Sequence, residues 1–316
     1  MATQLKSIDE SWDAGERAAV ADTPYTRRAR YFDSSNAFAF KYPPVPCHQF
    51  LAERDRALDP ATGTAVIPLD LSDRLGTDFA ATTPLILTRY LRIRAGDTLR
   101  THPKASGELY YVIEGSGETR NGADRIAWGP GDVFCLPGGA ESAHLAGDAD
   151  CVLWLITNEP ELAFEHLEPP RQDNAVTGPV HYPAAEIAHQ LRRVGEKLKG
   201  QKAAGLALVF SSADQVKSRN VLPSLTLAVN QLPPGEVQRP HRHNSAAITL
   251  SIQGERCYSM IGGRRVDWQQ DAVMVTPPGD IHSHHNEGEQ WMSCLIVQDG
   301  GLHYHCRTMD FRYADQ

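Results

Sequence analysis

The 316-residue chain is 41% hydrophobic and 22% charged, a composition typical of one large globular core or two modest ones. Its formal net charge of -8 argues against a nucleic-acid partner, because binding to a phosphate backbone needs clustered cations. The sequence has neither a long apolar run nor a basic signal segment, and its 6 cysteines form no Cys-x-x-Cys pair, so we expect a cytoplasmic protein with reduced thiols and no membrane contact.

Residues 1–75 carry no motif with an assignable chemistry, and we expect them to form an N-terminal arm. Ser7 followed by Glu10 is typical of a capping box, which indicates a short helix over residues 7–21. The prolines within residues 42–46 indicate an extended connector, because consecutive prolines disfavour both a helix and a central strand.

Residues 76–158 contain short runs of Val, Ile, Leu, Tyr and Trp separated by Gly, Pro, Asn and Asp, which is typical of a barrel or sandwich of strands. Within this segment Gly96 is followed after five residues by His102-Pro-Lys104. A return strand begins at Gly131 and passes through a Pro-Gly-Gly turn to Ser142. This pattern is the weaker of two copies of one motif, and the fuller copy lies at residues 235–282.

The weaker copy does not complete a metal site. Lys104 and Ser142 stand where the fuller copy has histidines, and a charged ammonium cannot ligate a metal. We therefore expect residues 76–158 to form a degenerate barrel with a structural role. An alternative is a site built from His102, Glu108 and the displaced His144.

Residues 159–205 are predicted to form a linker with one helix, from Pro183 to Gly200. The helix begins with a proline and ends with lysine and glycine, as helices commonly do. Its apolar residues recur at helical spacing and predict a buried stripe: Ile187, Leu191, Val194 and Leu198. Such a helix would bridge two barrels.

Residues 206–316 are predicted to form a metal-binding barrel. Strand residues alternate faces, so His241 and His243 project from one face as half of a metal site. A turn that contains Pro277 and Gly279 precedes His282, and closure of a small barrel would bring its imidazole to the first two. Three neutral imidazoles suit a divalent first-row metal and leave positions open for substrate and water.

The spacing of these residues resembles the two-part cupin signature: Gly, five residues, His-x-His, and later Pro-x-Gly, two residues, His, three residues, Asn. Two positions depart from it, since Ala247 replaces the glutamate of the first part and Asp271 the glycine that opens the second. The copy over residues 96–139 repeats the copy over residues 235–282. The resemblance implies an all-β bicupin, two antiparallel jelly-roll (cupin) barrels with a linking helix.

Residues 222–286 resemble the metal-bearing barrel of the gentisate 1,2-dioxygenase group, which also includes salicylate and 1-hydroxy-2-naphthoate dioxygenases. The resemblance implies Fe(II) bound by His241, His243 and His282. It also implies an extradiol-type, ring-cleaving dioxygenase that inserts both atoms of O2 into a small hydroxylated aromatic substrate. A metal-dependent cupin isomerase, lyase or hydrolase is an alternative, as is a binding or storage bicupin.

Two departures from that group concern the substrate. The metal-binding barrel is C-terminal here and typically N-terminal in the group. Thr249 stands where the group typically has an arginine that holds the substrate carboxylate in a fixed fork. Alternation from an inward Ala247 would give a polar wall without a fixed cation: Thr249, Ser251 and Gln253. We therefore expect gentisate itself to be a poor substrate.

The remaining expectations concern a cation for the substrate carboxylate, a base for the phenolic proton and the oligomeric state. Arg239 or Arg256 could supply a cation from another strand, although exposed strand-edge arginines are the alternative. His284 or His285 could accept the phenolic proton or support the ligating imidazoles, unless both are surface histidines. We expect a homo-dimer or homo-tetramer, because bicupins bury their outer sheet faces against each other or a partner chain.

Overall fold

The computed structural model describes residues 22–31, 34, 41–198 and 205–315, so the helix expected over residues 7–21 lies outside the described residues. The chain divides into two compact units, Met1–Tyr42 and Pro43–Gln316. In the first unit, helix α1 spans Pro24–Arg28, and the hydroxyl of its N-cap Thr23 accepts a hydrogen bond from the Thr26 amide at 3.1 Å. No helix among the described residues is long and apolar enough to cross a membrane.

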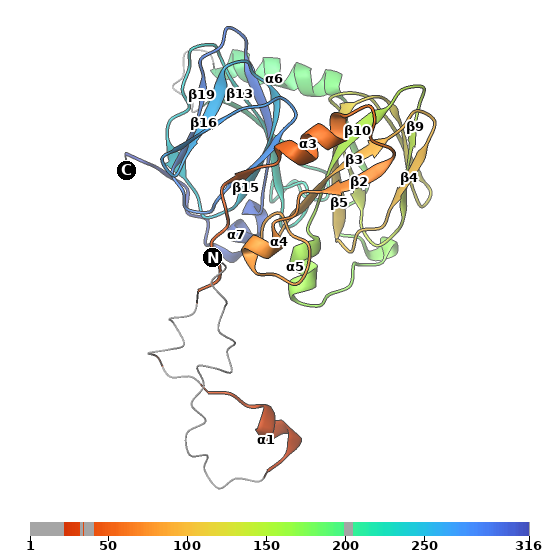
Figure 1. The fold of residues 1–316 in the computed structure, drawn as a ribbon, viewed down its shortest axis with the longest axis vertical. Coiled ribbons are helices and arrows are strands. Elements are labelled where there is room, and N and C mark those ends of the chain that lie inside the picture. The colour runs from red at the N-terminus through yellow and green to blue at the C-terminus, as the bar shows by residue number, and fades with distance from the viewer. Residues whose placement is uncertain (1–21, 32–33, 35–40, 199–204, 316) are drawn as a thin grey trace. The chain divides into compact units, whose positions relative to one another are not determined.

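The second unit contains two barrels with the same arrangement of eight strands (Figure 1). The strands of the first barrel are β3 (Leu87–Ile93), β4 (Thr98–Thr101), β5 (Gly107–Glu114), β6 (Gly117–Asn121), β7 (Asp124–Trp128), β8 (Val133–Pro137), β9 (Ser142–Ala146) and β10 (Cys151–Thr157). The strands of the second are β13 (Thr226–Leu232), β14 (His241–Arg242), β15 (Ala247–Gln253), β16 (Cys257–Ile261), β17 (Arg264–Asp267), β18 (Val273–Thr276), β19 (His282–Asn286) and β20 (Met292–Gln298).

Strands whose numbers differ by ten hold equivalent places in the two barrels. The larger sheets contain β8-β5-β10-β3 and β18-β15-β20-β13, and the smaller sheets contain β4-β9-β6-β7 and β14-β19-β16-β17. The pairings within these sheets are antiparallel. The predicted all-β fold, two antiparallel jelly-roll barrels that repeat one pattern, is confirmed.

Residues 43–75, which we expected to belong to an arm, instead extend both large sheets. Strand β1 (His48–Gln49) pairs with β18 of the second barrel, and β2 (Ala65–Pro68) pairs with β3 of the first. Helix α3 (Leu51–Leu58) lies between them in the chain, and α4 (Ser72–Leu75) follows β2. The chain thus enters the two large sheets soon after the prolines of residues 42–46, within the segment expected to form an arm.

Helices and strands also make up much of the connection between the barrels. It contains α5 (Glu159–Phe164), a 3-10 helix (Gln172–Asn174), β11 (Val180–Tyr182) and α6 (Ala184–Leu198), and β12 (Leu206–Val209) follows. Strand β11 pairs with β8, and β12 pairs with β13, so the connection lengthens both large sheets. After β20 the chain forms α7 (Gly300–Cys306) and β21 (Arg312–Tyr313), which pairs with β14.

The two large sheets face each other across one hydrophobic core. Alternate residues of their strands enter this core, for example Tyr90, Trp154 and Ile156 from the first barrel and Ile248, Val273 and Leu295 from the second. Helix α6 closes one side of the core with Ile187 (Figure 1). The other face of each strand points into its own barrel, where two smaller cores form. The shared core holds the barrels in a fixed relation through burial of apolar surface.

Asp271, which replaces a motif glycine, lies in a turn that is hydrogen-bonded to the other barrel. The Tyr90 hydroxyl of the first barrel donates to the Asp271 carbonyl oxygen of the second at 2.7 Å. Asp271 has a φ of +58°, and the corresponding Gly131 has a φ of +83°. Aspartate is one of the few residues with a side chain that tolerate this left-handed conformation, so the turn is retained without glycine.

Candidate metal centre

Three histidines meet inside the second barrel. His241 begins β14 and His282 begins β19, and the two residues are direct partners in the antiparallel pairing of these strands. His243 lies two residues after His241, so alternation returns its imidazole to the same side. The three side chains are buried, and one potential ligand atom of each lies within 4.8 Å of those of the other two. The structure thus brings together the three residues at which the sequence predicts a metal.

A tight turn sets the position of His282. Pro278 and Gly279 precede it, and the Gly279 φ of +80° is one that residues with a Cβ rarely adopt. The Gly279 amide donates a hydrogen bond to the His243 carbonyl oxygen at 2.7 Å. The turn before the third histidine is therefore tied directly to the backbone of the second.

Backbone carbonyl groups fix the tautomer of each imidazole. The three Nδ1 atoms lie 2.8–3.0 Å from a carbonyl oxygen two residues away in the chain. The partners are Arg239 for His241, Ser245 for His243 and Asp280 for His282. Because a carbonyl oxygen can only accept, each Nδ1 carries the ring proton and each Nε2 keeps the lone pair that a metal needs.

Burial keeps the three imidazoles neutral. Desolvation is the largest cause of a lowered pKa in all three, and it is reinforced in two of them by the neighbouring imidazoles. The pKa of His243 falls to about 4 and that of His282 to about 2. Neutral imidazole is the ligating form, and three of them leave a divalent ion its full charge with further positions open. This donor set fits Fe(II) as well as other first-row divalent metals.

An amide stands beside the imidazoles where a motif glutamate is missing. Ala247 belongs to the small core inside the second barrel, and its partner on the neighbouring strand is Gln298. Gln298 Nε2 lies 3.3 Å from His243 Nε2, and the Ser245 hydroxyl donates to Gln298 Oε1 at 3.2 Å. The side chain opposite Ala247 on β20 is therefore neutral, and it is held in place by a hydrogen bond.

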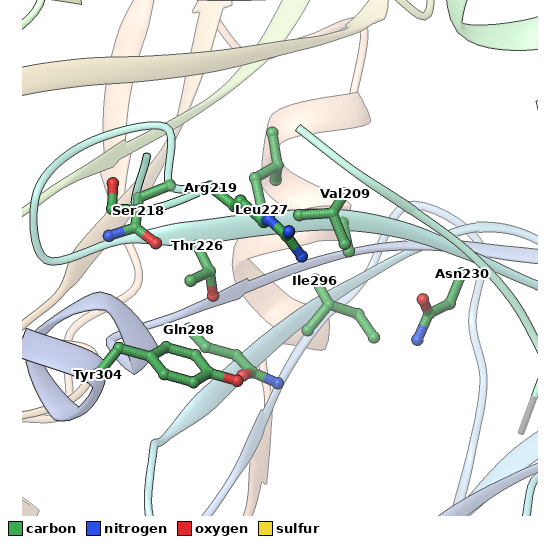
Figure 2. Close-up of a pocket in the computed structure, with 11 residues that line it drawn as sticks. Val209, Ser218, Arg219, Thr226, Leu227, Asn230, Ile296, Gln298 and Tyr304 are labelled. Carbon is green, nitrogen blue, oxygen red and sulfur yellow. The ribbon is translucent and has the colours of Figure 1, made fainter. Parts of the chain in front are cut away.

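A cavity of about 410 Å³ shares Gln298 with the surroundings of His243, although the three histidines are not among the described residues that line it (Figure 2). Inward-facing residues of β13 and β20 form much of its wall, and Gln298 belongs both to this wall and to the surroundings of His243. The wall combines apolar and polar residues, among them Ala228, Ile296, Asn230 and Tyr304. A single aromatic ring with polar substituents fits a cavity of this size and composition.

Arg219 lines the cavity and was missed by the sequence analysis. It lies in the connection between β12 and β13, where no periodicity or motif marks it. The two arginines that the sequence suggested are placed differently. Arg239 pairs with Asp315 at 2.6 Å, and Arg256 occupies a turn with a φ of +56°. Neither is among the described residues that line the cavity.

Thr249 faces the interior of the second barrel, as alternation predicts. It is 1% exposed, and its partners on the neighbouring strands are Met274 and Ile296. It is not among the described residues that line the cavity. Ser251 is also buried, whereas Gln253 is exposed because a bulge between these two residues shifts the register of β15 against β20. The expected polar wall therefore ends at Ser251.

The two candidate bases lie on opposite faces of β19. His284 is buried inside the barrel with its ring centroid 6.4 Å from that of His282, and its Nδ1 lies 2.8 Å from the Ser259 hydroxyl. Desolvation lowers the pKa of His284 to about 3, so its imidazole is neutral. His285 points the other way and stacks on Tyr258 with ring centroids 4.4 Å apart. The structure therefore brings His284, and not His285, toward the three imidazoles.

In the described part of the first barrel, no group of three potential ligands comes together. His102 is exposed, and Lys104 pairs with Glu168 at 3.0 Å. Glu108 and His144 are fully buried and hydrogen-bond to neighbouring hydroxyls: Tyr110 and Ser142 for Glu108, and Thr101 and Thr119 for His144. A polar network thus fills the interior of the first barrel around Ser142, which stands where the second barrel has the ligand His282.

Comparison with known proteins gives matches to part of the chain. The family model described as cupin domain matches residues 228–298. A 5-aminosalicylate 1,2-dioxygenase from Comamonas sp is 39% identical over 79 residues, which cover 25% of this chain and 21% of that relative. A gentisate 1,2-dioxygenase from Ralstonia sp is 25% identical over 138 residues, 43% of this chain and 39% of that relative. The chain thus spans about a fifth to two fifths of the length of these curated relatives.

The similarity in fold is more extensive. A salicylate 1,2-dioxygenase structure from Pseudaminobacter salicylatoxidans matches with a TM-score of 0.71 over 86% of this chain and 89% of that chain. The sequence identity in this match is 15%, so it concerns the fold and not the chemistry.

Proposed function

The chain is a gentisate/salicylate 1,2-dioxygenase-like bicupin, and from this premise we propose that it is a ring-cleaving dioxygenase. It inserts both atoms of O2 into a small hydroxylated aromatic compound. The observation that carries the proposal is the set of three buried, neutral imidazoles, one of which is hydrogen-bonded to Gln298 of a cavity of about 410 Å³. We propose Fe(II) as the metal, held by His241, His243 and His282 through their Nε2 atoms, because it is a borderline ion that imidazole suits.

Fe(II), when bound, supplies coordination positions for a phenolic oxygen and for O2 and lets electron density pass from the ring to oxygen. The protein's own residues hold the ring. Ile296 contacts its face and excludes water, and the Gln298 amide hydrogen-bonds to a substituent near the imidazoles. His284 is neutral, and the tautomer in which its Nδ1–H donates to the Ser259 hydroxyl oxygen leaves the Nε2 lone pair to accept the phenolic proton.

The proposal is tested by O2 consumption of the Fe(II)-loaded protein across a panel of phenols with and without an ortho carboxylate. We expect one equivalent of O2 per substrate, together with loss of the aromatic absorbance, for at least one electron-rich phenol. His282→Ala, which removes one ligand, is the control that should consume none. Substrate turnover without O2 consumption would contradict the proposal and indicate a metal-dependent isomerase, lyase or hydrolase.

A further inference from the structure

The strand that carries the first ligand, His241, is very short. Strand β14 consists of 2 residues, and it pairs with β19 at one position, His241 with His282. Its other edge pairs with β21 at both positions, His241 with Tyr313 and Arg242 with Arg312. More of the backbone pairing of β14 therefore comes from β21 than from the neighbouring barrel strand.

Residues 308–315, called the strap below, contain β21 and are fastened on both sides of the ligand pair. Pro240 directly precedes His241, and Asn244 directly follows His243. Three hydrogen bonds join these flanking residues to the strap: the Ala314 amide to the Pro240 carbonyl oxygen at 2.9 Å, the Asp310 amide to Asn244 Oδ1 at 3.0 Å, and Asn244 Nδ2 to the Thr308 carbonyl oxygen at 2.8 Å.

The strap presents an aromatic ring to His241. Partners in an antiparallel pair share a face, so Tyr313 lies on the same side as His241, and alternation puts Phe311 there too. The ring centroids of Phe311 and His241 are 5.1 Å apart, and those of Phe311 and Tyr313 are 5.3 Å apart. Phe311 is 49% exposed and His241 only 8%, so the phenyl ring contributes to shielding the imidazole from solvent.

Arg239 connects the strap to the orientation of the same imidazole. Its carbonyl oxygen accepts a hydrogen bond from His241 Nδ1 at 3.0 Å. Its guanidinium carbon lies 3.8 Å from the centroid of the Tyr313 ring, and its Nη2 pairs with Asp315 at 2.6 Å. The backbone group that fixes the tautomer of His241 therefore belongs to a residue whose side chain is held by the strap.

We propose that Phe311 is a positioning residue of the metal centre, which holds the His241 imidazole in its ligating orientation and slows loss of the metal. This inference rests on the proposed metal centre and not on the reaction. His282 lies on β19, which pairs with β16 along its whole length. His241 lacks such support from a barrel strand, and the strap supplies it. Groups that orient ligating imidazoles also set metal affinity.

The test uses Co(II) as the metal, because its visible absorption reports the arrangement of its ligands and needs no O2. Transfer of Co(II) from the loaded full-length protein to a chelator is timed for the wild type and for Phe311→Ala. We expect Phe311→Ala to release Co(II) about tenfold to a hundredfold faster and to change the absorption spectrum. Phe311→Tyr keeps the ring and should restore the spectrum, with a release rate within about twofold of the wild type.

Trp291→Ala is the matched control. Trp291 is an aromatic residue of similar exposure, 43%, immediately before β20 of the same barrel. The ring contacts of the three imidazoles with other described residues do not include it. Its replacement should leave Co(II) release unchanged. Equal acceleration of release by Phe311→Ala and Trp291→Ala, or by neither, would overturn the inference.

Measurement of O2 consumption separates this inference from the proposed function. Faster Co(II) release from Phe311→Ala, in a protein whose Fe(II)-loaded wild type consumes no O2 with any phenol, would support the inference and contradict the dioxygenase function. O2 consumption by the wild type with unchanged Co(II) release from Phe311→Ala would do the reverse. A wild type that retains no Co(II) would contradict both.

Discussion

Thr119 in β6 and Ser259 in β16 hold the same position in the two barrels, each between a tryptophan and a histidine. Each hydroxyl oxygen accepts a hydrogen bond from an indole Nε1 at 2.8 Å and lies 2.8 Å from an imidazole Nδ1. The partners are Trp128 and His144 in the first barrel, and Trp268 and His284 in the second. The internal repeat thus persists in side-chain hydrogen bonds even where the metal ligands do not.

Because the two positions are equivalent, the effect of a substitution on stability can be separated from its effect on activity. Ser259→Ala and Thr119→Ala each leave a buried indole N–H unpaired, so each should lower the free energy of unfolding by about 1–3 kcal/mol. Only Ser259→Ala should also lower kcat and change its pH dependence, because only His284 lies near the three imidazoles. Urea unfolding and steady-state kinetics check the two effects. An equal loss of kcat in both variants would show that Ser259 acts through stability alone.

Removal of any one imidazole should abolish tight metal binding, because each supplies one of three protein ligands. For His241→Ala, His243→Ala and His282→Ala we expect the iron content to fall from about one per chain to below about one tenth. The circular dichroism of the folded protein should be retained. His285→Ala is the control from the same strand, since His285 faces away and stacks on Tyr258. Retention of one iron per chain in two of the three ligand variants would refute the site.

The first barrel should bind no metal. Lys104 is paired with Glu168, and the buried Glu108 and His144 already have hydrogen-bond partners. Elemental analysis of the purified protein should therefore give one metal per chain, and His102→Ala should leave activity within about twofold of the wild type. Two tightly bound ions per chain would contradict this assignment.

The sequence predicts that the three histidines meet at one site, because the direction of each side chain follows from local rules. Alternation puts His241 and His243 on one face, and a proline-glycine turn places His282 at the start of the next ligand strand. The same alternation distinguishes His284 from His285, since residues 282 and 284 share a face, but the sequence analysis did not use it. Alternation of side chains along the strand therefore predicts the inward position of His284 as well as the positions of the ligands.

Other parts of the site depend on contacts that no local rule provides. Gln253 turns outward because a bulge in β15 interrupts the alternation that was expected to continue. Arg219 lies in an irregular connection, and its relation to the cavity exists only once β13 and β20 are paired. Gln298 faces Ala247 for the same reason. Residues separated by some fifty positions become neighbours through strand register, which a single sequence specifies only weakly.

Ala247→Glu should restore the carboxylate that the cupin pattern usually contains. A glutamate at this position faces the barrel interior opposite Gln298, beside His243. A fourth, charged ligand should tighten metal binding and occupy a position that the substrate needs, so we expect higher metal affinity with at least about tenfold lower kcat/KM. Ala247→Gln has the same size without the charge and should leave metal affinity unchanged. Chelator competition and kinetics provide the two measurements.

The last prediction concerns a carboxyl group that takes no part in the reaction. Glu108 in the first barrel is 0% exposed, and its Oε1 has no hydrogen-bond partner among the described residues. Desolvation is the main cause that raises its pKa from 4.5 to about 7, although hydrogen bonds from Tyr110 and Ser142 oppose this shift. A raised pKa means that the folded protein binds the proton more tightly than the unfolded chain. The contribution of Glu108 to stability is therefore fully present below pH 4.5 and is lost as the pH rises toward 7.

Glu108→Gln removes this titration and keeps an oxygen that can accept from Tyr110 and Ser142. We expect the variant to match the wild type near pH 4.5 and to be more stable than the wild type by about 1–3 kcal/mol at pH 8. Buried histidines such as His144, whose pKa is lowered to about 3, change stability in the opposite direction as the pH falls below 6.5. They are present in both proteins and cancel in the comparison. Urea unfolding at both pH values gives the difference directly, and a stability difference that does not change with pH would show that Glu108 stays ionised in the folded barrel.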